Sequence, residues 1–162
     1  MVDLIKTASL LEAHGFKDVK FNSEFLGSPF NVIASRGGRY TLLIEHSQRL
    51  DFRESDRIAN DFIRIDDDSK GYWGRFDYFT YCVLTEAAEG DAASSLLGRV
   101  NDRIRATYPT FKKGGGDLIL VETSTGSVAR CPSFHHLQRE LAVKKLQIVI
   151  RELLGPPNPP ST

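Results

Sequence analysis

The clearest hydrophobic pattern consists of two short apolar runs, residues 30–34 and 40–44, separated by the pair Gly37-Gly38. Both runs are rich in β-branched and aromatic residues, so together with the two glycines they predict a β-hairpin. Apolar residues follow one another in each run instead of alternating with polar ones, which is typical of strands covered on both faces. We therefore expect these strands in the middle of a sheet, with helices on either side.

The other elements follow from the spacing of apolar residues before and after this hairpin. Helices are predicted where apolar residues recur every three or four positions, and strands where apolar or β-branched residues run together or alternate. The predicted helices cover residues 3–14, 51–65, 91–108 and 133–154, the predicted strands 18–21, 78–85, 118–123 and 127–131, and residues 22–29 are a predicted loop. This order predicts an α/β fold, a mixed β-sheet flanked by helices.

Length and composition fit one domain. The chain has 162 residues, 41% of them hydrophobic and 26% charged, so we expect a single domain over residues 1–155 and a disordered proline-rich tail over 156–162. The 21 basic and 21 acidic residues cancel, which predicts no general attraction to nucleic acid, although a local basic face stays open.

The chain shows no pattern that predicts membrane insertion or secretion. No apolar run reaches the length of a transmembrane helix, and the first residues lack a basic-then-apolar signal, so we expect a cytoplasmic protein that does not bind membranes. Cys82 and Cys131 lie in apolar strand-like segments. This context favours buried thiols, with a disulfide as the alternative.

Three short motifs in the first half of the chain follow one another in an order that can be compared with known protein families. They are Gly15-Phe16 after the first helix, Phe30-Asn31-Val32-Ile33-Ala34 in one strand of the hairpin, and Leu42-Leu43-Ile44-Glu45 in the other. With the element order of residues 1–86, they resemble the PD-(D/E)XK restriction-endonuclease-like superfamily of nucleases. The resemblance implies an αβββαβ core, to which this chain adds a C-terminal hairpin and helix.

The resemblance also implies where a nuclease site would lie. In the family, an acid in the second strand and another at the end of the third hold Mg²⁺, and a lysine two residues later orients the attacking water. These positions fall on Asn31, Glu45 and Ser47. A neutral amide attracts a divalent cation weakly and a serine supplies no positive charge, while His46 should point to the opposite face of its strand. The site is therefore predicted to be degenerate, with no cofactor.

Two main functional hypotheses follow. The first is a non-catalytic domain that binds or regulates a protein or a nucleic acid. The alternative is an active Mg²⁺-dependent nuclease with displaced ligands, using Glu45 together with Glu24 or Glu122. A purely structural or inhibitory interaction protein is a third class. The sequence is also compatible with a homo-oligomer.

Side chains outside these motifs are candidates for ligand contacts. Tyr72, Trp73 and Phe76 lie between glycines, where they could stack on a ligand or base, fold back over the sheet, or anchor a protein interface. Arg36 and Arg39 flank the glycine turn and could contact phosphate.

Three further patterns are weak metal-site candidates. Residues 66–77 partly imitate a calcium loop, but a solvated acidic loop is favoured. Cys131 with His135 and His136 lacks a sensible fourth ligand, so surface histidines are favoured. Glu122 could meet Glu45 only if their strands were neighbours, and a surface position is favoured for it.

Overall fold

The computed structural model describes residues 3–68, 78–107, 115–133 and 137–156. Its helices and strands follow one another in the predicted order. They are α1 (Leu4–Ala13), β1 (Lys17–Phe25), β2 (Ser28–Arg36), β3 (Tyr40–Leu50), α2 (Phe52–Asp68), β4 (Tyr78–Ala88), α3 (Ala92–Thr107), β5 (Gly115–Glu122), β6 (Ser127–Cys131) and α4 (Leu137–Leu154).

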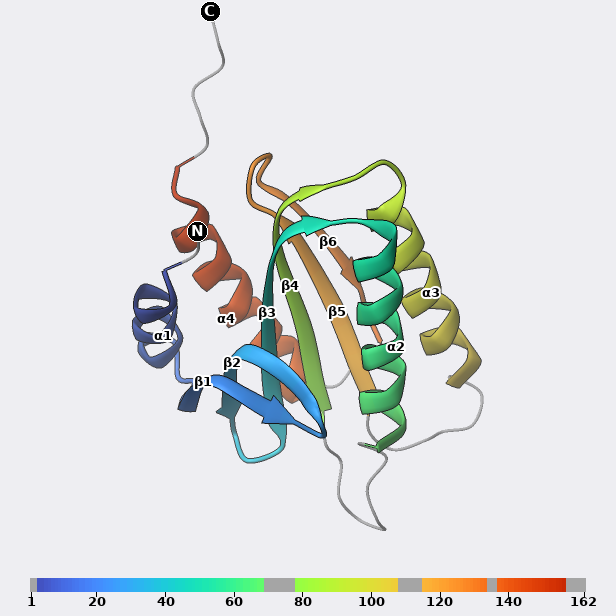
Figure 1. The fold of residues 1–162 in the computed structure, drawn as a ribbon. Coiled ribbons are helices and arrows are strands. Elements are labelled where there is room, and N and C mark those ends of the chain that lie inside the picture. Colours follow the sequence, from blue (N-terminus) through green and yellow to red (C-terminus); the bar gives the residue numbers. More distant parts are fainter. Residues whose placement is uncertain (1–2, 69–77, 108–114, 134–136, 157–162) are drawn as a thin grey trace, which may run out of the picture.

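The strands form one six-stranded mixed sheet in chain order, from β1 to β6 (Figure 1). β3, β4 and β5 run parallel to one another, whereas the pairs β1–β2, β2–β3 and β5–β6 are antiparallel hairpin pairs. The parallel strands are connected through α2 and α3, as parallel neighbours require. The predicted α/β class is confirmed, and α1 to β4 follow the expected αβββαβ order, while the relationship to the nuclease superfamily stays a prediction.

Helices cover both faces of the sheet and create two apolar layers (Figure 1). One layer joins α1 and α4 to the sheet through residues such as Leu42, Ile44 and Leu146. The other joins α2 and α3 to the opposite face through residues such as Leu43 and Phe62. The expectation of strands covered on both faces is confirmed for residues 40–44. In the first strand of the hairpin only one face is fully covered, because every second residue is half-buried or exposed.

The prediction of a loop over residues 22–29 is wrong. β1 continues to Phe25, β2 begins at Ser28, and only Leu26 and Gly27 form the turn, with φ values of 47° and 84°. Two consecutive positive φ values give the tight hairpin turn whose twist suits antiparallel strands. The segment has no regular apolar alternation that would predict strands. Its strand state comes from antiparallel pairing, with Glu24 opposite Pro29 and Phe25 opposite Ser28 next to the turn, and the ladder continues to Phe21 opposite Val32.

The two thiols behave as predicted. Cys82 and Cys131 are both buried and free. Cys82 belongs to the layer under α1 and α4, whereas Cys131 belongs to the layer under α2 and α3. In the ranges that the structure describes, no helix combines the length and the apolar content that crossing a membrane requires.

Candidate functional site

Asn31 and Glu45 lie next to each other where the pairing of β2 with β3 ends, although both strands continue past them. The antiparallel ladder between β2 and β3 ends at the pair Val32–Ile44. Beyond it, the side-chain oxygen of Asn31 accepts a hydrogen bond of 2.7 Å from the backbone N–H of His46. The side-chain amide of Asn31 therefore links the two strands beyond their last backbone pair, and its oxygen already has a hydrogen-bond donor within the protein.

Glu45 lies on the sheet face that α2 covers, and its carboxylate is bound from two sides. One oxygen accepts a hydrogen bond from the phenol of Tyr81, and the other accepts one from Arg57 of α2. The Glu45 side chain is only 13% exposed. Arg57 also donates to Glu54 at 2.7 Å and to Asp61 at 3.0 Å. Glu45 thus belongs to a network of one cation, three carboxylates and a tyrosine.

The electrostatics of this network hold Tyr81 protonated and Arg57 charged. Burial raises the pKa of Tyr81, and the negative charge of Glu45 raises it further. Burial alone would lower the pKa of Arg57, but its hydrogen bond to Glu54 and the charge of Glu45 outweigh that effect and raise it. The cation beside Glu45 is therefore a permanent one. Sequence reasoning missed it, because Arg57 lies on the polar side of the helical pattern and only the packing of α2 turns it toward the sheet.

Ser47 occupies the position of the family lysine but contributes only a local contact. It lies two residues after Glu45, and its hydroxyl donates to the backbone carbonyl of Arg49 at 3.0 Å. A hydroxyl that donates to its own strand does not activate a water in the way that a lysine would.

The arginines predicted to contact phosphate lie away from Glu45. Arg36 is paired with Tyr40 at the turn of the β2–β3 hairpin, whereas Asn31 lies five residues earlier in the same strand, beyond the last β2–β3 pair. Arg36 is half-buried and packs beside Gly15, and Arg39 is exposed in the turn. The structure therefore does not bring these arginines to the predicted acid site.

Several predicted contacts lie outside the described residues. They are Tyr72, Trp73 and Phe76, most of the calcium-like segment 66–77, and the histidines His135 and His136.

Glu122 does not meet Glu45, so the condition for a two-carboxylate site is not fulfilled. β4 lies between β3 and β5, with Glu45 opposite Val83 and Glu122 opposite Thr85. Glu24 is on the edge strand β1, opposite Pro29. Within the described part of the chain, no three His, Cys, Asp or Glu side chains are grouped in a way that could hold a metal ion.

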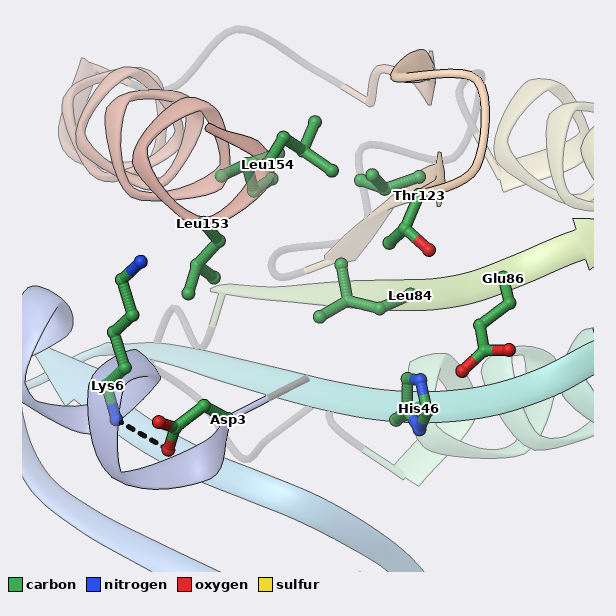
Figure 2. Close-up of a pocket in the computed structure, with 10 residues that line it drawn as sticks. Asp3, Lys6, His46, Leu84, Glu86, Thr123, Leu153 and Leu154 are labelled. Atoms are coloured by element: carbon green, nitrogen blue, oxygen red, sulfur yellow. Dashed lines mark hydrogen bonds between the residues drawn. The ribbon is translucent and has the colours of Figure 1, made fainter. Parts of the chain in front are cut away.

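The structure adds a pocket of about 450 Å³ on the opposite face of the sheet (Figure 2). It lies at the carboxyl ends of β3, β4 and β5, beside the first turn of α1 and the last turn of α4. Its size is in the range of small-molecule sites, and open α/β sheets bind ligands outside the carboxyl ends of their parallel strands. Its lining residues are Asp3, Lys6, His46, Leu84, Glu86, Val121, Thr123, Ile150, Leu153 and Leu154.

The pocket combines an apolar floor with a polar rim. His46 lines it, which confirms that this side chain points away from the Glu45 face. The Nε2 atom of His46 is buried and, among the described residues, has no hydrogen-bond partner. Asp3 on the rim caps α1, because its carboxylate accepts from the N–H groups of Ile5 and Lys6. Figure 2 shows the bond to Lys6. A second depression of about 520 Å³ shares Thr123 and Leu154 with this pocket and extends it toward the β5–β6 turn.

Sequence reasoning missed this pocket because its lining comes from five elements far apart along the chain. The usable signal was the pair of parallel strands 78–85 and 118–123, whose carboxyl ends must lie at one edge of the sheet. A scan against protein-family models found no match to this sequence, and a search of curated proteins found none either.

Proposed function

We propose that this chain is a non-catalytic binding domain with a restriction-endonuclease-like core, and that its partner is a protein. The observation that carries the proposal is the engagement of both Glu45 oxygens, one by Tyr81 and the other by Arg57. A metal-binding carboxylate needs oxygens that face the ion, and a guanidinium in that place repels a divalent cation. Glu45 therefore acts in the proposal as a structural acid.

The charge distribution favours a protein over a nucleic acid. The net charge is zero. Six described arginines form ion pairs with aspartate or glutamate, which leaves them less able to neutralise phosphates. They are Arg49, Arg57, Arg64, Arg99, Arg103 and Arg130. Binding to a nucleic-acid backbone depends on several lysines and arginines that release its counterions.

The pocket at the carboxyl ends of the parallel strands is the place where we expect the protein partner to bind. Its leucine-rich floor can bury an apolar side chain, and each buried side chain of this kind contributes about 1.5–3 kcal/mol. Lys6 and Glu86 on the rim provide charges of both signs, which suits the polar border of a protein interface.

A cleavage assay tests the non-catalytic part of the proposal. Wild-type protein is incubated with plasmid DNA and with RNA in the presence of Mg²⁺ or Mn²⁺, beside the variant Glu45→Ala. Glu54→Ala is the matched control, because Glu54 is a second glutamate bonded to Arg57. We expect no cleavage by any of the three proteins. Cleavage by the wild type and by Glu54→Ala that disappears in Glu45→Ala would establish the nuclease alternative instead.

A binding assay tests the partner class. Immobilised wild type is compared with Leu153→Arg, which places a charge in the pocket, and with Leu141→Arg, which changes a leucine of α4 that is already 45% exposed. We expect a protein retained by the wild type and by Leu141→Arg to be lost from Leu153→Arg. A mobility shift of DNA or RNA that weakens steeply with salt would contradict the choice of a protein partner.

A further inference from the structure

Arg139 is an unusual residue at the buried face of α4. The apolar stripe of this helix packs on the sheet through residues such as Val143 and Leu146, and Arg139 extends the same stripe by one turn toward the amino end. It is only 1% exposed. Arginine is almost never fully buried unless its charge and its N–H groups find partners.

The guanidinium of Arg139 is bonded on one side only. Its Nη1 donates to the hydroxyl of Ser133 at 2.6 Å, and its central carbon lies 5.9 Å from the centroid of the Tyr78 ring. Its Nε and Nη2 atoms are buried and have no hydrogen-bond partner among the described residues. These two atoms form one edge of the planar group, and their parallel N–H bonds match the two oxygens of an oxyanion.

The carboxylates nearby are already bonded to another arginine. Asp117 is fully buried, accepts from Thr80 at 2.6 Å and accepts from Arg130 at 2.8 Å. Glu140 also accepts from Arg130 at 2.8 Å. Burial lowers the pKa of Arg139, and the charges of Asp117 and Glu140 offset only part of that effect. A further anion on this unpaired edge would oppose the penalty that burial places on the charged guanidinium.

We propose that the Nε–Nη2 edge of Arg139, at the amino end of α4, binds the carboxylate of a small singly charged ligand. Two observations support this class. The planar edge fits a carboxylate through two parallel hydrogen bonds, and the helix end adds a favourable dipole. Asp117, Glu140, Arg130 and Arg139 are formally balanced in charge, so a dianion would meet more repulsion from the carboxylates than a single charge does. Ser133, whose hydroxyl accepts from the opposite Nη1 of the guanidinium, is half-buried.

Arginine side-chain NMR provides a local readout. Protein labelled with ¹⁵N-arginine is titrated with sodium formate, and with sodium chloride at the same ionic strength. The Nε signal of Arg139 is assigned by its absence from Arg139→Lys, and the exposed Arg151 on the same helix is the internal control. We expect a saturable shift of the Arg139 signal with formate, a much weaker response to chloride, and no saturable shift at Arg151.

Two variants make the test specific. Arg139→Lys keeps the charge but loses the two-pronged edge, so formate binding measured by calorimetry should weaken about tenfold or more. Arg151→Lys should bind formate as the wild type does. If Arg139→Lys does not fold, Ser133→Ala replaces it, because it keeps the edge but removes the hydroxyl that orients it, and formate should then bind several-fold more weakly.

The inference is overturned if the Arg139 signal does not saturate with formate, or if chloride produces the same shift. Saturation by sulfate without saturation by formate would overturn the carboxylate class. The site lies at the amino ends of the parallel strands and does not depend on the role proposed for Glu45.

Discussion

Replacing Glu45 with alanine should destabilise the folded protein, because Tyr81 and Arg57 would each lose an acceptor. Tyr81 is fully buried, so its hydroxyl would be left without its charged partner in the interior. Arg57 is affected less, since its side chain is 37% exposed and it keeps its bonds to Glu54 and Asp61.

These contacts set the expected size of the effect. A hydrogen bond to a charged acceptor contributes about 1.5–3 kcal/mol. The partly exposed ion pair with Arg57 adds at most about 1 kcal/mol, because solvent screens it. We therefore expect Glu45→Ala to lower the free energy of unfolding by about 2–4 kcal/mol. Tyr81→Phe should lower it by about 1.5–3 kcal/mol, since it removes the same hydrogen bond from the other side.

Urea unfolding followed by circular dichroism measures these differences. The double variant Glu45→Ala with Tyr81→Phe should lose clearly less stability than the sum of the single variants, because both remove one interaction. Glu54→Ala is the matched control and should change the free energy of unfolding by no more than about 1 kcal/mol, as Glu54 is partly exposed.

The opposite result would refute the structural role of Glu45. Acids that are conserved for metal binding repel their neighbours in an empty site, so their removal is commonly neutral or stabilising. If Glu45→Ala is as stable as the wild type or more stable, and if its effect adds to that of Tyr81→Phe, Glu45 is not held by Tyr81 in the way described.

Three further predictions concern other parts of the fold. Gly116→Ala should cost about 1–3 kcal/mol in urea unfolding, because a Cβ there would overlap the ring of Phe79 on the neighbouring strand, and Phe79→Leu should relieve part of the loss. Burial raises the pKa of Cys82 to about 12 and that of Cys131 to about 11, so an alkylating reagent at pH 8 should label neither thiol until the protein unfolds. Since an unfolded thiol ionises near pH 9.0, the stability that the protonated thiols contribute is complete below that pH and falls as the pH rises toward 11. Asp3→Ala should cost about 1 kcal/mol in thermal unfolding, because it removes the acceptor at the start of α1, whereas Asp3→Asn should restore most of it.

The local patterns of the chain were sufficient for most of the fold. Apolar periodicity located the four helices found in the described residues, and the glycine pair placed the β2–β3 hairpin correctly. The alternation of side chains along a strand also predicted that His46 and Glu45 point to opposite faces. These features depend on near neighbours in the chain, so a single sequence contains the necessary information.

The site depended on contacts that no local pattern shows. Arg57 reaches Glu45 from the next helix, and Arg139 is buried although its neighbours in the sequence are polar. The position of β4 between β3 and β5 separates Glu45 from Glu122. The pocket exists only because parts of five elements that are far apart along the chain meet at one edge of the sheet.

Residues 22–29 show why local patterns predict some features of this protein and not others. The hairpin closes through the pairs Glu24–Pro29 and Phe25–Ser28, and its ladder continues to Phe21 opposite Val32, so its strand state depends on pairing register and not on the composition of the segment. In the same way, the partner of a charged side chain is decided by the packing of whole elements, since the orientation of a helix about its axis determines which of its residues face the sheet. Periodicity therefore determines which elements form, while the side chains that meet are settled only when those elements pack together.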